Sequence, residues 1–155
     1  MSKTTATASN AMTPAEVEAF LARRQNARLA TVCADGHVQL TPVWYWPEGG
    51  KIWFTLGEGR VHLRNIRRSP KATLLMDEDL RLTDGWAAAA RAVMLSGSVE
   101  VFDDAARLAR YEELMAVHYL GAEAADPEFA AAVELERRYL LCLTPERSLT
   151  WDYSK

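Results

Sequence analysis

Residues 28–56 carry three short apolar segments separated by strong turn signals, and this pattern constrains the fold more than any other feature. The segments are rich in β-branched and aromatic residues, as β-strands are. Asp35-Gly36 separates the first two segments, and Pro47-Glu48-Gly49-Gly50 separates the second from the third. Turns this short join strands into hairpins. No alternation of strands and long helices follows, so the pattern favours an antiparallel sheet.

The rest of the chain adds helices and further strands to this sheet. Thr13-Pro14-Ala15-Glu16 has the residues of a capping box, which predicts a helix start, and this helix is expected to end near residues 24–26. Further along, we expect helices over 60–68 and 126–137, and a helix that is capped by Asp103 or Asp104 and runs to about residue 120. Strands are expected over 71–77, 90–102, 139–145 and 147–153. Residues 78–90 fit a helical turn or an irregular loop. The sum is a mainly β fold: a six- to seven-stranded antiparallel barrel with peripheral helices.

Length and charge narrow the function classes. The 155 residues suit one domain, and 49% of them are hydrophobic, enough for a real core. A net charge of −3 argues against a nucleic-acid binder, and no apolar run is long enough to cross a membrane. Residues 1–12 are small and polar, so we expect a disordered tail before a single domain over 13–155. Cys33 and Cys142 fit buried, reduced thiols in a cytoplasmic protein.

Residues 40–65 gather the side chains that a ligand would need. Two strands carry five aromatic residues, which form a wall for a flat ring or simply fill the core. Pro42 lacks an N–H, so it predicts a sheet edge or a bulge beside this wall. The loop Gly57-Glu58-Gly59 then leads into a helix with Arg60, Arg64, Arg67 and Arg68. A helix start with an arginine suits an anion, although a solvated basic face is the plainer interpretation.

No residue is assigned an acid–base, nucleophilic or metal-binding role. The sequence has no Ser-His-Asp, Cys-His or paired-carboxylate arrangement, and its histidines and cysteines lack metal-ligand spacing. An enzyme of this kind would depend on a bound cofactor for its chemistry.

Four segments together resemble the pyridoxamine-phosphate-oxidase-like flavoprotein family. They are RLATVCADGHVQLTPVWY, IWFTLGEGR, RNIRRSPKATLLMD and VMLSGSVEVFDD, with a weaker echo near Trp151-Asp152-Tyr153. The chain is most similar to the small bacterial branch that binds FMN or the deazaflavin coenzyme F-420. The resemblance implies a split β-barrel and a homodimer with two cofactor sites at the subunit interface. It also implies that the cofactor ring lies against Pro42, Val43 and Trp44, while Phe54, Thr55 and Leu56 line the site.

The same resemblance assigns the phosphate to the loop and helix from Arg60 to Asn65. We expect Arg60, His62 and Arg64 to bind it, Thr55 and the backbone of residues 42–44 to contact the ring, and Trp151 to close the pocket. Family members usually have lysine where this chain has His62. Neutral histidine is a weaker phosphate partner, although a bound phosphate would favour its charged form.

These expectations lead to a hypothesis with two alternatives. The leading hypothesis is a cytoplasmic, dimeric oxidoreductase whose bound FMN or deazaflavin exchanges a hydride with a small, planar substrate. One alternative is a non-catalytic module that stores or senses a flavin, a haem or a similar ring, and another is an oligomeric structural domain with an empty site. Oxidation of pyridoxamine phosphate itself is not expected, because the ending RSLTWDYSK has few basic residues for a substrate phosphate.

Overall fold

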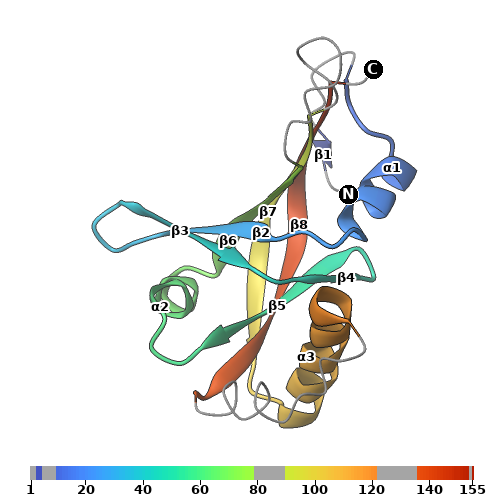
Figure 1. Cartoon of the computed structure of the whole chain (residues 1–155). Helices are drawn as coiled ribbons and strands as arrows, with labels where there is room; N and C mark the ends of the chain where they lie inside the picture. The colour runs from blue at the N-terminus through green and yellow to red at the C-terminus, as the bar shows by residue number, and fades with distance from the viewer. Residues whose placement is uncertain (1–2, 5–9, 79–89, 122–135, 154) are drawn as a thin grey trace.

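One strongly curved antiparallel sheet forms the body of the protein in the computed structural model, and the described residues form three helices around it (Figure 1). The structure describes residues 3–4, 10–78, 90–121, 136–153 and 155. Seven strands follow one another across the sheet in the order β3-β2-β6-β7-β8-β5-β4, and a short β1 pairs with β8 in parallel. The strands are β1 (Lys3–Thr4), β2 (Ala27–Val32), β3 (Val38–Val43), β4 (Trp46–Glu48), β5 (Lys51–Gly57), β6 (Lys71–Asp77), β7 (Arg91–Phe102) and β8 (Arg138–Asp152).

The two outermost strands are consecutive in the chain, and this explains the curl of the sheet. Strand β3 is one edge and β4 is the other, yet Val43 and Trp46 are separated by two residues only. Such a connection reaches at most about 11 Å. The edges must therefore come close to each other, which bends the sheet into a half-barrel. This confirms the predicted antiparallel split-barrel class.

Two of the predicted tight turns are present. In the β2–β3 hairpin, the N–H of Gly36 donates to the carbonyl of Cys33 at 3.0 Å, and Gly36 has a φ of 87°. In the β4–β5 hairpin, Gly49 and Gly50 have φ values of 62° and 72°, which a two-residue turn between twisted strands requires. The turn is shorter than the sequence suggested, because residues 47 and 48 belong to β4.

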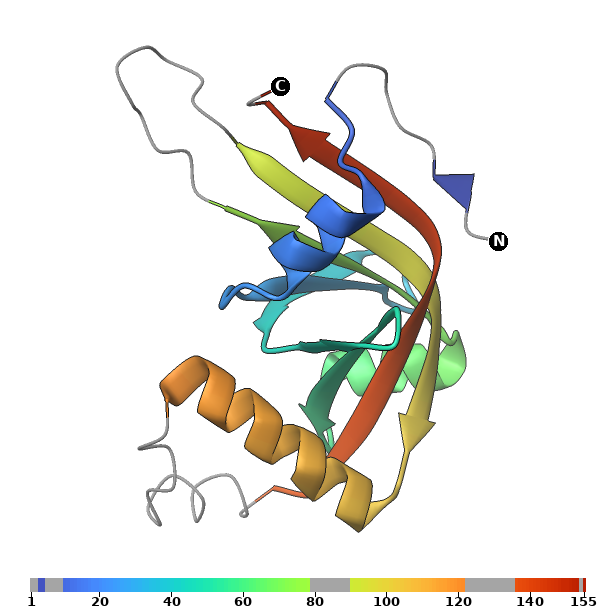
Figure 2. The ribbon, with the colours of Figure 1, turned by 90° about the vertical axis from the view of Figure 1, so that its right-hand side faces the viewer.

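The prediction of two separate strands after residue 138 was wrong, because β8 is one strand of 15 residues. Pro145 suggested a break, since proline cannot donate to a ladder. It lies opposite Gly97, where the β7–β8 register shifts, so the missing N–H falls at a bulge. A Cβ on Gly97 would lie 1.9 Å from the carbonyl oxygen of Thr144, so this crossing requires glycine. Figure 2 shows the resulting long, bent β7–β8 pair.

The helices start where the sequence predicted. Helix α1 (Pro14–Leu21) has the full capping box of Thr13 and Glu16, but it ends before the predicted residues 24–26. Helix α2 (Val61–Arg68) follows the glycine loop, and α3 (Ala105–Leu120) is capped by the Asp104 side chain. Helices α1 and α3 lie at opposite ends of the β7–β8 pair (Figure 2). Residues 79–89 lie outside the described residues. So does the predicted helix over 126–137, apart from its last two residues.

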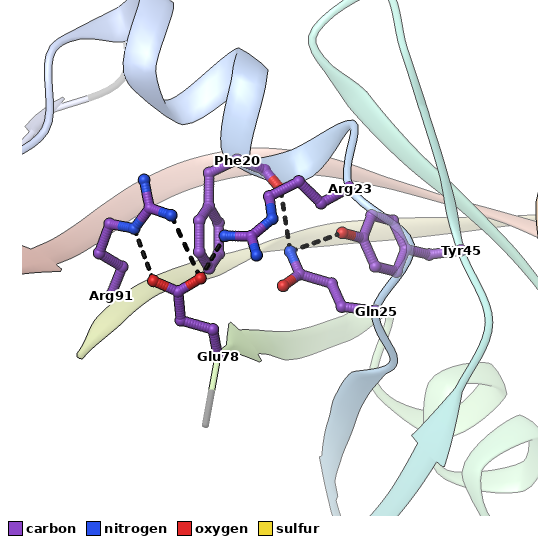
Figure 3. Close-up of polar contacts among 6 residues, drawn as sticks. All are labelled: Phe20, Arg23, Gln25, Tyr45, Glu78 and Arg91. Atoms are coloured by element: carbon purple, nitrogen blue, oxygen red, sulfur yellow. Dashed lines mark hydrogen bonds and ion pairs between the residues drawn. The ribbon is translucent and has the colours of Figure 1, made fainter. Parts of the chain in front are cut away.

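Polar contacts after α1 fix the connection between β3 and β4 (Figure 3). The side-chain amide of Gln25 donates to the carbonyl of Phe20 at 2.9 Å and to the hydroxyl of Tyr45 at 3.2 Å. The Tyr45 hydroxyl itself donates to the carbonyl of Leu21 at 2.8 Å, and its burial raises the pKa of Tyr45. Nearby, Glu78 receives hydrogen bonds from both Arg23 and Arg91. The backbone on either side of Tyr45 is therefore held in one position.

The core lies inside the curl. Its fully buried members include Leu29, Phe54, Leu63, Leu74 and Leu141. Alternate side chains of two strands face this core: Leu29 and Thr31 of β2 are buried, and so are Ile52, Phe54 and Leu56 of β5. Residues 10–12 pack against β8, where the N–H of Asp152 donates to the carbonyl of Asn10 at 2.8 Å. Met12 is buried and its N–H donates to the Thr150 hydroxyl at 2.9 Å. No helix among the described residues is long and apolar enough to span a membrane.

Candidate functional site

A cleft of about 510 Å³ opens beside the connection between β3 and β4. The end of β3, the end of β5, the start of α2, one face of α3 and the start of β8 form its walls. Its lining residues are Gln39, Thr41, Pro42, Val43, Trp44, Thr55, Leu56, Gly57, Arg60, Val61, His62, Glu112, Met115, Ala116 and Arg138. Seven of the predicted site residues are thus brought together, from segments that are separate in the chain: Pro42, Val43, Trp44, Thr55, Leu56, Arg60 and His62.

Trp44 forms a rigid aromatic wall of this cleft. Its ring stacks on Tyr119 of α3, with centroids 4.7 Å apart and the planes 3° from parallel. The Tyr119 hydroxyl donates to the carbonyl of Gln25 at 2.7 Å and accepts the N–H of Tyr45 at 3.2 Å. Burial raises the pKa of Tyr119 to about 12, so this hydroxyl keeps its proton. Because Tyr119 is held on both sides, Trp44 has a fixed orientation.

The start of α2 forms the polar end of the cleft. Arg60 occupies the N-cap position, and its side chain makes no capping hydrogen bond to the helix. The first N–H groups of a helix have no intrahelical partners and carry partial positive charge. An anion at this point would therefore meet both these N–H groups and the Arg60 guanidinium. In the structure, this guanidinium is paired with the carboxylate of Glu136 at 3.1 Å.

His62, one residue into α2, is only 4% exposed. Its Nδ1 lies 2.9 Å from the hydroxyl oxygen of Thr31, and its Nε2 has no hydrogen-bond partner among the described residues. Burial lowers the pKa of His62, because the charged imidazolium loses its hydration. At pH 7 the side chain is therefore expected as an uncharged imidazole, and its Nε2 is unpaired among the described residues.

Two charged residues in the cleft were missed from the sequence. Arg138, at the start of β8, donates to Glu112 of α3 at 2.8 Å and to the hydroxyl of Thr55 at 2.5 Å. The pair fixes α3 against β5 and places a guanidinium beside Thr55. Neither residue is in a local motif, and they are 26 positions apart in the chain. Only the β5–β8 pairing brings Arg138 to this place, so no signal near it in the sequence could have identified it.

The remaining predicted site residues lie elsewhere. Phe54 is fully buried in the core, and Arg64 is on the exposed side of α2, outside the cleft lining. Asn65 is buried behind His62, where its amide donates to Thr31 at 2.9 Å. Trp151 lines a different depression of about 400 Å³, together with Arg91 and Tyr153. Within one chain, therefore, Trp151 does not face the cleft.

Comparison with known structures agrees with this architecture. The chain is similar to a conserved hypothetical protein from Mycobacterium tuberculosis, with a TM-score of 0.79 and 24% identity over 95% of this chain and 89% of that one. An F-420 reductase has a TM-score of 0.59 and 24% identity, covering 84% of this chain and 94% of that one. HutZ, the haem storage protein from Vibrio cholerae, has a TM-score of 0.64 and 19% identity, covering 86% and 89%. At these identities, the likeness shows a shared fold.

The family itself follows from the sequence match. The model of the pyridoxamine 5'-phosphate oxidase family matches residues 13–152, which include every strand of the sheet apart from β1. The matched region also contains all the residues that line the cleft. The chain therefore belongs to the pyridoxamine 5'-phosphate oxidase family.

Proposed function

We propose that the cleft binds FMN or the deazaflavin F-420 and that the protein is an oxidoreductase that passes a hydride between this cofactor and a small, planar substrate. One observation carries the proposal: the Trp44 wall and the start of α2, with Arg60 at its N-cap, line the same cleft. A flat ring with an attached phosphate needs both features at once. Family membership adds support, and so does the similarity to an F-420 reductase.

The side chains of the cleft would bind and orient the cofactor. A bound flavin or deazaflavin supplies hydride transfer by its own ring chemistry. Its ring would lie along the backbone from Pro42 to Trp44, at the end of β3, which pairs with β2 alone among the described strands. Thr55 and Arg138 are placed for hydrogen bonds to polar atoms of the ring. Arg60 and the first N–H groups of α2 would hold the phosphate.

We further propose that two copies form a homodimer with the cofactor sites at their interface. The β2–β3 hairpin projects from the sheet (Figure 1). It carries three exposed apolar side chains on one face, which we call the hairpin strip. They are Val32, Val38 and Leu40, with exposed fractions of 56%, 64% and 58%. Pro42, two residues beyond Leu40, lines the cleft. A partner on the hairpin strip would therefore stand next to the cofactor.

A non-catalytic storage module for a flavin or a haem is the second candidate. The fold is shared with a haem storage protein. The acidic group that lines the cleft, Glu112, is already bound to Arg138, which leaves it poorly suited to proton transfer. A storage protein would need the Trp44 wall and the anion site at the start of α2, but its cleft would not need space for a second substrate.

Absorbance titration of the purified protein with FMN, F-420 and haemin would test the two candidates. We expect FMN or F-420 to bind in the micromolar range or tighter, and reduced cofactor to be reoxidised by small planar acceptors. Arg60→Ala should weaken binding about 10- to 100-fold, as loss of a charged hydrogen bond predicts. Arg67→Ala is the control, because Arg67 pairs with Glu58 outside the cleft lining. Failure of both cofactors to bind would contradict the proposal, and binding without turnover would favour storage.

A further inference from the structure

Three buried side chains form a chain of hydrogen bonds behind the cleft. Asn65, Thr31 and His62 are each 3–4% exposed. The amide nitrogen of Asn65 donates to the hydroxyl oxygen of Thr31 at 2.9 Å, and that oxygen lies 2.9 Å from Nδ1 of His62. Arg68 donates to the amide oxygen of Asn65 at 3.5 Å, which agrees with this orientation of the amide.

The direction of these bonds determines where His62 carries its proton. The Thr31 hydroxyl accepts from Asn65 and has one proton of its own to donate. If that proton goes to Nδ1 of His62, every polar atom between Asn65 and Nδ1 is paired. The reverse arrangement, with the proton on Nδ1, would leave the Thr31 hydroxyl proton without an acceptor among its contacts. The first arrangement is the better one, and it puts the imidazole proton on Nε2.

The Nε2–H of His62 is then a buried donor without an acceptor among the described residues. Leaving such a donor unpaired is unfavourable, because its hydration is lost and nothing replaces it. His62 lines the cleft next to Arg60 and the start of α2. We propose that Asn65 and Thr31 are positioning residues that hold His62 as an uncharged Nε2–H donor, and that this donor binds an oxygen of the cofactor's phosphate. The inference rests on the proposed function.

This role differs from the one expected from the sequence, in which a phosphate draws His62 into its charged form. The burial that lowers the pKa of His62 opposes that change. The positive charge at the phosphate would then come from Arg60 and the start of α2. His62 would add one hydrogen bond of fixed direction and no charge. Replacement of a charged lysine by a neutral donor would keep the hydrogen bond and remove one unit of charge.

Nitrogen-15 NMR of the His62 ring tests the inference on the wild-type protein. We expect the Nε2–H tautomer in the free protein at pH 7. Addition of FMN should shift the Nε2 resonance, whereas riboflavin, which has the same ring without the phosphate, should leave it in place. A charged ring or an Nδ1–H tautomer would overturn the inference. So would an unchanged Nε2 resonance when the flavin spectrum shows that FMN is bound, and that result would leave the proposed function intact.

Variants of His62 and Thr31 give a second readout by FMN titration. His62→Gln keeps an N–H donor near the position of Nε2 and should bind FMN within about threefold of the wild type. His62→Leu removes the donor and should weaken binding at least about tenfold, with little effect on riboflavin. Thr31→Val removes the proton given to Nδ1, so both tautomers should become visible in the NMR spectrum. Equal FMN affinity of the Gln and Leu variants would overturn the inference. If FMN and F-420 bind to none of these proteins, the proposed function fails as well, and the tautomer is still measured.

Discussion

At the scale of single residues, a carboxylate of the chain itself, that of Glu136, competes with an anion for Arg60. The guanidinium of Arg60 is paired with Glu136, whose carboxylate also packs over Gly57. A Cβ at position 57 would lie 2.4 Å from that carboxylate, so glycine is what permits the close approach. A phosphate at the start of α2 would have to share Arg60 with Glu136 or displace it.

Replacing Glu136 should therefore strengthen cofactor binding. Glu136→Gln keeps the shape of the side chain but removes its charge, so Arg60 becomes more available to the phosphate. The Arg60 side chain is 64% exposed, and exposed ion pairs contribute at most about 1 kcal/mol. We thus expect FMN affinity to rise about two- to fivefold in an absorbance titration. Glu58→Gln is the matched control, since Glu58 pairs with Arg67 away from the cleft. If the two variants behave alike, Glu136 is no competitor.

His62 should make the stability of the protein depend on pH below neutrality. The pKa of His62 in the folded protein lies below its usual value of 6.5. Between these two values, the histidine is protonated in the unfolded chain and uncharged in the folded one. The free energy of unfolding should then fall as the pH drops below 6.5, by at most about 1.4 kcal/mol per pH unit. The carboxylates with lowered pKa values, such as Glu16 at about 2, lose their contribution only below 4.5.

Urea unfolding between pH 7.5 and 5 measures this effect. The wild type should lose stability across this range more steeply than His62→Gln, which has no titrating group at that position. Parallel curves for the two proteins would mean that His62 is hydrated in the folded state. That outcome would also weaken the case for its unpaired Nε2–H donor.

At the scale of elements, the contact of α3 with the β3–β4 connection sets the shape of the cleft. Tyr119 stacks on Trp44 and joins two backbone segments through its hydroxyl. Tyr119→Phe keeps the stacked ring but removes both hydrogen bonds. We expect it to lower the free energy of unfolding by about 1–3 kcal/mol, because buried backbone groups lose their partner. Tyr153→Phe, at an exposed tyrosine, should change stability by less than about 0.5 kcal/mol.

Urea denaturation followed by tryptophan fluorescence is suited to this test, since Trp44 is one of five tryptophans whose surroundings change on unfolding. Tyr119→Leu should cost more than Tyr119→Phe, because it also removes the stacked ring. Equal stability of Tyr119→Phe and wild type would show that packing alone holds the wall.

The elements that the sequence predicted well are those with local signals. Capping residues marked the starts of α1 and α3, and paired glycines marked the β4–β5 turn. The continuity of β8 could not be predicted, because Pro145 is tolerated only through its long-range position opposite Gly97. His62 was predicted at the cleft and lines it, but its burial beside Asn65 on the inward face of α2 was not predicted. That burial depends on the long-range contact of both side chains with Thr31 of β2.

At the scale of the whole molecule, the curl of the sheet creates the cleft and also exposes the hairpin strip. Strand β3 is an edge with its cross-strand apolar pair of Val32 and Val38 facing outward. Monomeric proteins rarely leave contiguous apolar patches on long edge strands, because such edges promote association. Because Gln39, Thr41, Pro42 and Val43 of the same strand line the cleft, such an association would affect cofactor binding.

A charge in the hairpin strip should separate the subunits and weaken cofactor binding together. We expect the wild type to elute as a dimer in size-exclusion chromatography with light scattering. Leu40→Glu should give monomers, because a buried, unpaired carboxylate is strongly unfavourable at an apolar interface. It should also reduce FMN affinity at least about tenfold, as a site shared between subunits would require. Val117→Glu introduces the same charge at an exposed apolar position of α3 and should alter neither property. A monomeric Leu40→Glu protein with unchanged FMN affinity would place the whole site within one chain, and a dimeric one would move the interface away from the hairpin strip.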